Sequence, residues 1–128
     1  MSSLAALGLR AGEQRLLLID PPDGVLVEAG GMKPRPSIAS TLQVAKPAER
    51  IVWWPERHLL DPARLSRLHW LLEMAEGEGW LVFDPDDEEP LSEQELHRAL
   101  AETYLSVGET VTLPNGDVAV HVTPGAAN

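Results

Sequence analysis

The sequence contains no cysteine, which excludes disulfides, thiolate metal ligands and cysteine nucleophiles. A chain without cysteine fits a reducing compartment. No apolar run approaches the length of about 18 residues that a membrane helix needs. Residues 1–11 also lack the charged start and long apolar stretch of a secretory signal. We therefore expect a cytoplasmic protein that makes no use of a membrane.

Basic residues are scarce, with 10 Lys and Arg against 20 Asp and Glu, so the formal net charge is −10. Residues 1–60 carry seven bases and six acids, whereas residues 61–128 carry three bases and fourteen acids. Phosphate backbones repel such a chain, and basic patches interleaved with aromatic residues are lacking, so we expect no nucleic-acid partner. The acidic half is either a solvated surface or a face for a basic partner.

Three apolar runs followed by proline have the character of buried strands, and two segments have the caps and stripes of helices. The runs are Arg15–Asp20, Arg50–Trp54 and Trp80–Asp84, and the helical segments begin at Asp61-Pro62 and at Ser92-x-x-Glu95. The first helix has apolar residues at spacings of three and four and ends at Gly77 and Gly79. The second runs over about residues 93–105, with an inner stripe of Leu96, Leu100, Thr103 and Tyr104 and an end at Gly108.

Shorter segments complete the pattern. Val25–Glu28 and Ser37–Leu42 are candidate short strands, and Pro114-Asn115-Gly116 between two alternating runs predicts a closing hairpin. Alternating strands and helices predict an α/β fold, a Rossmann-like three-layer sandwich with a mainly parallel sheet and a C-terminal antiparallel hairpin. We expect the hairpin to add one antiparallel strand at the edge of the sheet. The prediction is one domain over residues 1–128, with residues 1–12 and 124–128 as frayed ends.

Carboxylates follow two of the predicted strands, at Asp20 and at Asp84 with Asp86. The carboxyl ends of parallel strands meet at one edge of a sheet, which is where such folds bind ligands. Carboxylate oxygens suit Mg²⁺, so these three residues are the candidate metal ligands. The alternative is that Asp-Pro simply stops each strand, because aspartate in turns hydrogen-bonds to nearby backbone.

The best local candidate for a binding surface is the segment after the second strand. Trp53 and Trp54 point to opposite faces of a strand, so both can pack in a core. Alternatively, an exposed Trp54 anchors a partner or ligand. Candidate contact residues are then Trp54, Glu56, Arg57, His58 and, on the neighbouring loop, Asp23.

The order of the elements resembles an uncharacterised bacterial family of small methyltransferase-like α/β proteins. The resemblance rests on Leu7-Gly8-Leu9, Leu16–Asp20 with Pro22-Asp23-Gly24, Ile51–Trp54, Asp61–Met74, Gly79–Val82, Ser92–Leu105 and the final hairpin. It implies a reduced methyltransferase-like core. The chain departs from the family at Asp84-Pro85-Asp86, where the family has a Pro-Lys pair.

Active methyltransferases of this fold place a glycine-rich loop after the first strand to hold S-adenosylmethionine. The equivalent loop here, residues 20–24, contains two prolines, which remove amide donors and stiffen the backbone. Walker, Gly-x-Gly-x-x-Gly and Gly-x-Ser-x-Gly motifs are absent as well. We therefore expect no cofactor.

These observations favour a protein that is not an enzyme, namely a protein-interaction module on a degenerate methyltransferase-like fold. Its partner is another protein or a second copy, which pairs through the edge of the C-terminal hairpin. One alternative is an Mg²⁺-dependent or small-molecule-binding enzyme that uses the strand-end carboxylates. The other is an atypical S-adenosylmethionine-dependent methyltransferase.

Overall fold

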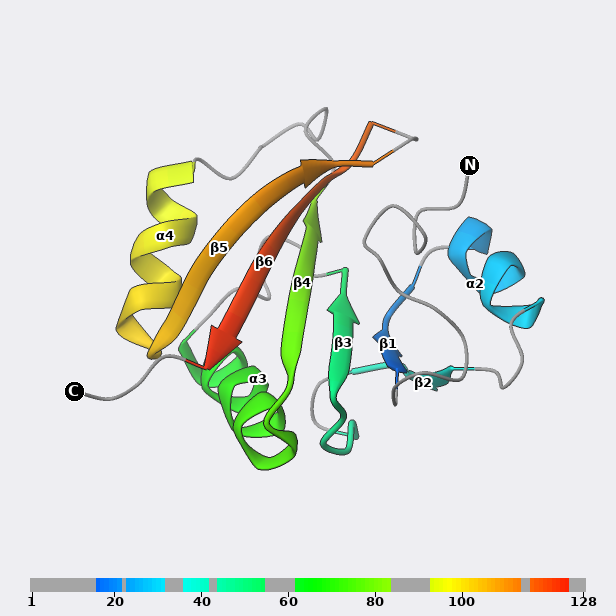
Figure 1. The fold of residues 1–128 in the computed structure, drawn as a ribbon, viewed down its shortest axis with the longest axis horizontal. Helices are drawn as coiled ribbons and strands as arrows, with labels where there is room; N and C mark the ends of the chain where they lie inside the picture. Colours follow the sequence, from blue (N-terminus) through cyan, green and yellow to red (C-terminus); the bar gives the residue numbers. More distant parts are fainter. Residues whose placement is uncertain are drawn as a thin grey trace.

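The structure, a computed structural model, describes residues 16–21, 23–31, 36–41, 44–54, 62–83, 93–113 and 116–124. Within these ranges six strands form one sheet in the order β2-β1-β3-β4-β6-β5 (Figure 1). The strands are β1 (Leu16–Ile19), β2 (Ser37–Ala39), β3 (Arg50–Trp53), β4 (Glu78–Phe83), β5 (Leu105–Thr112) and β6 (Val118–Pro124). The helices are α2 (Asp23–Gly30), α3 (Pro62–Ala75) and α4 (Glu93–Glu102).

The sheet is mostly parallel, as the sequence predicts. Strands β2, β1, β3 and β4 pair in parallel, and β6 pairs antiparallel with both β4 and β5. The expected position of the antiparallel strand is wrong, because β6 lies inside the sheet and β5 forms the edge. Five residue pairs join β6 to β4, from Gly79↔Val122 to Phe83↔Val118. The hairpin therefore attaches through its second strand.

Two apolar cores lie on the two faces of the sheet. One core joins Leu17, Ile19, Ile51 and Trp53 of the strands to α3 and to Leu100 of α4. The other joins Leu16, Leu18 and Val52 to Val25 and Ala29 of α2. Successive strand residues alternate between the two cores, as the pleat requires. This arrangement confirms the three-layer sandwich, with α3 and α4 on one face and α2 on the other.

Residues 25–28 belong to helix α2, so the prediction of a short strand there is wrong. The buried residues of the segment are Val25 and Ala29, four positions apart, which is the spacing of a helix face. Val27, which a strand would bury together with Val25, is 80% exposed. Asp23 supplies a negative charge in the first helical turn, where the helix dipole favours it.

Helix α3 buries Leu65, Leu68, Leu71 and Leu72, the predicted stripe. It ends earlier than expected, because Glu76 already adopts a left-handed conformation with φ of 52°. Gly77 then passes close to the backbone before β3, while Gly79 lies inside β4 instead of ending the helix.

The second predicted helix is also shorter than expected. Helix α4 ends at Glu102, and Gly108 lies within β5. Leu100 and Thr103 are buried, and the Thr103 hydroxyl donates to the Ala99 and Leu100 carbonyls at 3.0 and 3.1 Å. Tyr104 is 61% exposed with φ of 59°, so its predicted place on the inner stripe is wrong. Its backbone has already turned out of the helix toward β5.

The short strand near residue 37 and the closing hairpin are confirmed, although β2 covers only Ser37–Ala39. At the hairpin the Leu113 N–H donates to the Asp117 carbonyl at 2.8 Å, and Gly116 has φ of 94°. Across the described ranges, each helix is too short or too polar to cross a bilayer.

Candidate functional site

The chain reverses its direction of growth across the sheet at β1. It leaves β1 for β2 on one side and later returns to β3 on the other side. Ligands of open α/β sheets bind outside the carboxyl ends of the strands at such a point. Two backbone hydrogen bonds tie these ends together, from Asp20 N–H to Ala39 O at 2.8 Å and from Trp54 N–H to Ile19 O at 3.2 Å. We refer to the carboxyl ends of β1 and β3, with the start of α2, as the switch-point edge.

Asp20 occupies the turn after β1 with its side chain exposed and φ of 52°. Aspartate tolerates this left-handed region better than most residues that carry a Cβ. Asp23 is exposed at the first position of α2. A Cβ placed on Gly24 meets no atom within 4 Å, so the space beside the helix start is open. Two exposed carboxylates therefore flank the connection between β1 and α2.

Trp54 is half-buried and packs against the core beneath α2, while Trp53 is buried on the opposite face. The two rings thus follow the expected alternation, and core packing accounts for much of Trp54. Of the predicted site residues, Asp20, Asp23 and Trp54 come together at the switch-point edge. The others, Glu56, Arg57, His58, Asp84 and Asp86, lie outside the described residues.

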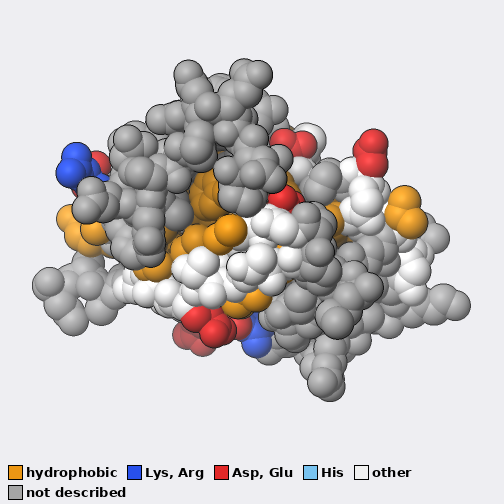
Figure 2. Space-filling view, turned by 90° about the horizontal axis from the view of Figure 1, so that it is seen from above, with side chains coloured by type: hydrophobic (Ala, Val, Ile, Leu, Met, Phe, Trp, Pro, Cys, Tyr) orange, Lys and Arg blue, Asp and Glu red, His pale blue; other side chains and the backbone are white. Residues whose placement is uncertain are grey.

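Figure 2 looks onto the molecule from the side toward which β3 and β4 point. Hydrophobic side chains occupy the middle of the visible described surface and also its two sides, and acidic side chains lie beside the central hydrophobic group as well as at the lower margin. Within the described part of the chain, no three His, Asp or Glu residues are grouped to hold a metal ion.

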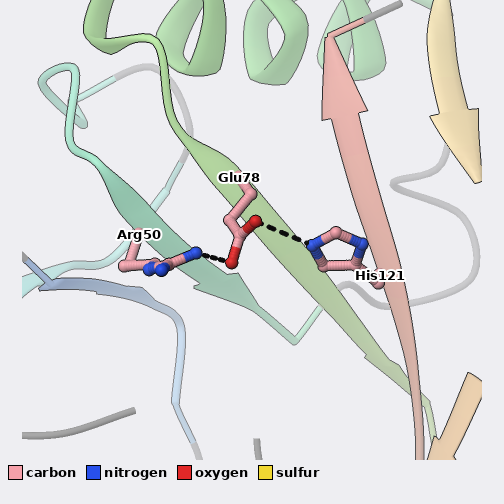
Figure 3. Close-up of polar contacts among 3 residues, drawn as sticks. All are labelled: Arg50, Glu78 and His121. Atoms are coloured by element: carbon pink, nitrogen blue, oxygen red, sulfur yellow. Dashed lines mark ion pairs between the residues drawn. The ribbon is translucent and has the colours of Figure 1, made fainter. Parts of the chain in front are cut away.

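A second polar cluster lies at the opposite edge of the sheet (Figure 3). Arg50 and Glu78 are the first residues of β3 and β4 and stand opposite each other in the parallel register. Their side chains form an ion pair, and the second Glu78 oxygen lies 3.2 Å from Nε2 of His121 on β6. Sequence reasoning missed this cluster. The sequence does show a charged residue at the start of each of two apolar segments, Arg50 and Glu78. That these two residues pair, however, follows only from the register between β3 and β4.

His121 is held closely on the sheet. Its ring lies 4.8 Å from the Trp80 ring, centroid to centroid, and its side chain is 20% exposed. A Cβ on Gly108 would stand 2.6 Å from Nδ1, so any larger residue at that position would force the ring to shift. Burial lowers the pKa of His121; Glu109 opposes the shift and Arg50 adds to it. The imidazole is therefore neutral near pH 7.

A surface hollow of about 600 Å³ adjoins this cluster and is lined by Glu49, Arg50, residues 75–78 and Thr123. The cluster joins the amino ends of β3 and β4 to the antiparallel strand β6, across the sheet from the switch-point edge. The neutral imidazole of His121 donates to a carboxylate that is already ion-paired. Among the described contacts, no nucleophilic side chain lies beside this imidazole. We assign the cluster a structural role in joining the three strands.

No family model and no curated protein sequence matches the chain. The similarities that exist are to solved structures, and they define a Rossmann-like methyltransferase fold. An O-methyltransferase of neocarzinostatin biosynthesis, in complex with S-adenosylmethionine, gives a TM-score of 0.63 at 13% identity over 86% of this chain and 48% of its own. A methyltransferase from Aquifex aeolicus gives 0.62 at 16% identity over 93% of this chain and 86% of its own. Magnesium protoporphyrin IX methyltransferase from Synechocystis PCC 6803 gives 0.54 at 13% identity, over 94% and 74%.

These similarities confirm the methyltransferase-like fold that the order of elements predicts. They also correct one expectation. We expected a protein that is not an enzyme, and the comparison contradicts this expectation, because the solved structures of this fold reported above are all methyltransferases. The chain spans about half the length of the neocarzinostatin enzyme.

Proposed function

We propose that this chain binds S-adenosylmethionine at the switch-point edge and serves as the cofactor-binding part of a methyltransferase. The observation that carries the proposal is the meeting of β1, β3 and the start of α2 at a reversal of strand order, in a fold shared with enzymes solved with this cofactor. An oxygen nucleophile is the proposed methyl acceptor, by analogy with the O-methyltransferase neighbour.

The residues at this edge fit the cofactor through their side chains. S-adenosylmethionine carries ribose hydroxyls, an ammonium and a sulfonium, and all of these suit carboxylate neighbours. Asp20 and Asp23 are both exposed there. Gly24 leaves open space for close approach. Trp54 follows β3 at the same edge, and its half-buried indole adds apolar surface there.

The loop amides contribute less than a glycine-rich loop would. Pro21 has no N–H, and the Asp20 N–H is already used by the Ala39 carbonyl. The left-handed turn that a glycine often makes is made here by Asp20. Binding therefore depends on carboxylates more than on backbone donors. When bound, S-adenosylmethionine supplies an electrophilic methyl group, and the chain's part is to hold and orient it.

Isothermal titration calorimetry with S-adenosylmethionine and S-adenosylhomocysteine tests the proposal. We expect both to bind, and we expect Asp20→Asn to weaken S-adenosylmethionine binding at least tenfold. Asparagine also accepts the left-handed turn, so this change removes the charge and keeps the backbone. The matched control is Glu102→Gln, which removes an exposed carboxylate at the end of α4 and should leave binding unchanged.

A thermal-shift assay provides a second readout. Ligand at 100 times its dissociation constant stabilises a protein by about 2.7 kcal/mol. No heat and no thermal shift at millimolar S-adenosylmethionine, with a folded protein, would refute cofactor binding. Equal affinity in the wild type and Asp20→Asn would refute the assigned site.

A further inference from the structure

Exposed apolar side chains gather at one end of the sheet. Seven large hydrophobic residues are exposed within the described residues. Four of them belong to α2, β2 and the segment that follows β2, namely Leu26, Val27, Ile38 and Val44. The other three, Trp70, Met74 and Tyr104, lie on or after α3 and α4. Figure 1 shows α2 and β2 at the side of the molecule farthest from α4 and β5.

The same end carries an edge strand. β2 is the last strand of the sheet, and among the described strands only β1 pairs with it. A row of unpaired backbone groups on an edge strand is a template for another strand. Ile38, the middle residue of β2, is 52% exposed.

A preformed hollow lies beside β2. It has a volume of about 420 Å³ and is lined by Leu17, the three residues of β2 and residues 44–48. Ala45 and Ala48 anchor that segment in the core, and Arg67 of α3 donates to the Ala45 carbonyl at 3.3 Å. The wall of the hollow is therefore fixed by packing, while Val44 on its rim stays 64% exposed.

Charge distinguishes the two ends of the sheet. Residues 36–48, around β2, contain one base, Lys46, and no acid, and helix α2 at the same end adds Asp23 and Glu28. Residues 101–113, around the other edge strand β5, contain Glu102 and Glu109 and no base. Two molecules that each carry a charge of −10 repel one another, and the repulsion is weakest where their surfaces are nearly neutral. A second copy can therefore approach at β2 more easily than at β5.

We propose that the chain forms a homodimer in which the β2 strands of two copies pair antiparallel about a two-fold axis beside Ile38. Pairing two edges continues the sheet from one copy into the other, and the apolar side chains on both sides of the edge cover one another. A two-fold interface uses the same patch twice, which suits a patch with little charge. This surface replaces the hairpin edge expected from the sequence, because β5 is acidic and its register is irregular between Val107 and Thr110.

Sedimentation velocity or light scattering after gel filtration tests the dimer without any ligand. We expect Ile38→Asp and Val44→Asp to raise the dimer dissociation constant at least tenfold, because each places a charge in the apolar contact. Met74→Asp is the matched control, since Met74 is 62% exposed on α3, outside the patch. It should dimerise like the wild type. Circular dichroism checks that each variant is folded.

The absence of cysteine allows a position-specific test. Ile38→Cys introduces a single thiol, and residues directly opposite in an antiparallel pair have Cβ atoms about 4.5–5.5 Å apart. We expect mild oxidation to cross-link this variant rapidly into a disulfide dimer. Met74→Cys, treated in the same way, should cross-link much more slowly.

A wild-type protein that stays monomeric at about 100 μM would overturn the proposal. Equal cross-linking of both cysteine variants would overturn the assigned surface, as would a dimer unaffected by Ile38→Asp. Capture of an unrelated extended peptide at β2 by a monomeric protein would also contradict it. These outcomes are independent of cofactor binding, because Ile38→Asp should bind S-adenosylmethionine like the wild type.

Discussion

Gly77 occupies a position where a single methyl group has no space. A Cβ at this residue would lie 2.5 Å from the Glu49 carbonyl oxygen, 2.7 Å from the Ala48 carbonyl oxygen and 2.8 Å from the Glu49 carbonyl carbon. All three atoms belong to the backbone, so rotation of a side chain cannot relieve the contact. Real Cβ atoms essentially never approach so closely. Gly77→Ala therefore requires the segment ahead of β3 to move.

That movement would break specific bonds. The Glu78 N–H donates to the Glu49 carbonyl at 3.0 Å, and the Gly77 N–H donates to the Leu72 carbonyl at 2.9 Å. Overpacking in a closely packed site costs about 1–3 kcal/mol. We expect Gly77→Ala to lie at the upper end, about 3 kcal/mol, because backbone must shift. For a domain of this size that corresponds to a decrease in Tm of roughly 10 °C.

Urea unfolding followed by tryptophan fluorescence measures the effect, with Gly30→Ala as the matched control. A Cβ on Gly30 meets nothing within 4 Å, and this residue ends α2 with no positive φ. Gly30→Ala should therefore be neutral or stabilise by up to about 1 kcal/mol. The reasoning is refuted if Gly77→Ala unfolds at the same urea concentration as the wild type, or if the two alanine variants lose equal stability.

Two further predictions follow from the local geometry. Burial places the folded-state pKa of His121 below its unfolded value of 6.5, so the unfolded chain binds the proton more readily and stability falls as pH drops through 6.5. His121→Phe should therefore flatten the dependence of unfolding free energy on pH between 7 and 5. An unchanged slope would contradict this. Glu76 is exposed with φ of 52°, a left-handed conformation that strains a residue with a Cβ. Glu76→Gly should therefore stabilise the protein by up to about 1 kcal/mol in urea unfolding. A clear loss of stability would show that the left-handed turn is not strained.

The sequence identifies elements well where one physical signal dominates. The four buried leucines of α3 recur at helical spacing behind an Asp-Pro start, and the segment is a helix. Residues 25–28 are harder to assign from the sequence, because Val25 and Val27 alternate as in a strand. Only burial shows that Val25 and Ala29 share a helical face. Short apolar segments permit both periods, and tertiary packing decides between them.

Strand order and side-chain clusters depend on contacts distant in sequence. Nothing local to residues 105–124 says that β6 enters between β4 and β5. The Arg50–Glu78–His121 cluster depends on that insertion and on two registers. By contrast, Asp20 and Trp54 could be placed at one edge from the sequence, since both follow apolar runs that pair in parallel.

The interior position of β6 also constrains how the chain can be completed during synthesis. β5 is made before β6, yet among the described strands it pairs only with β6. Until residues 118–124 are available, β4 therefore lacks its described partner on the outer side and β5 lacks its strand partner. Such an edge is prone to pair with other chains. β6 thus closes the described sheet between β4 and β5, and any delay in its arrival prolongs a stage of folding that is prone to aggregation.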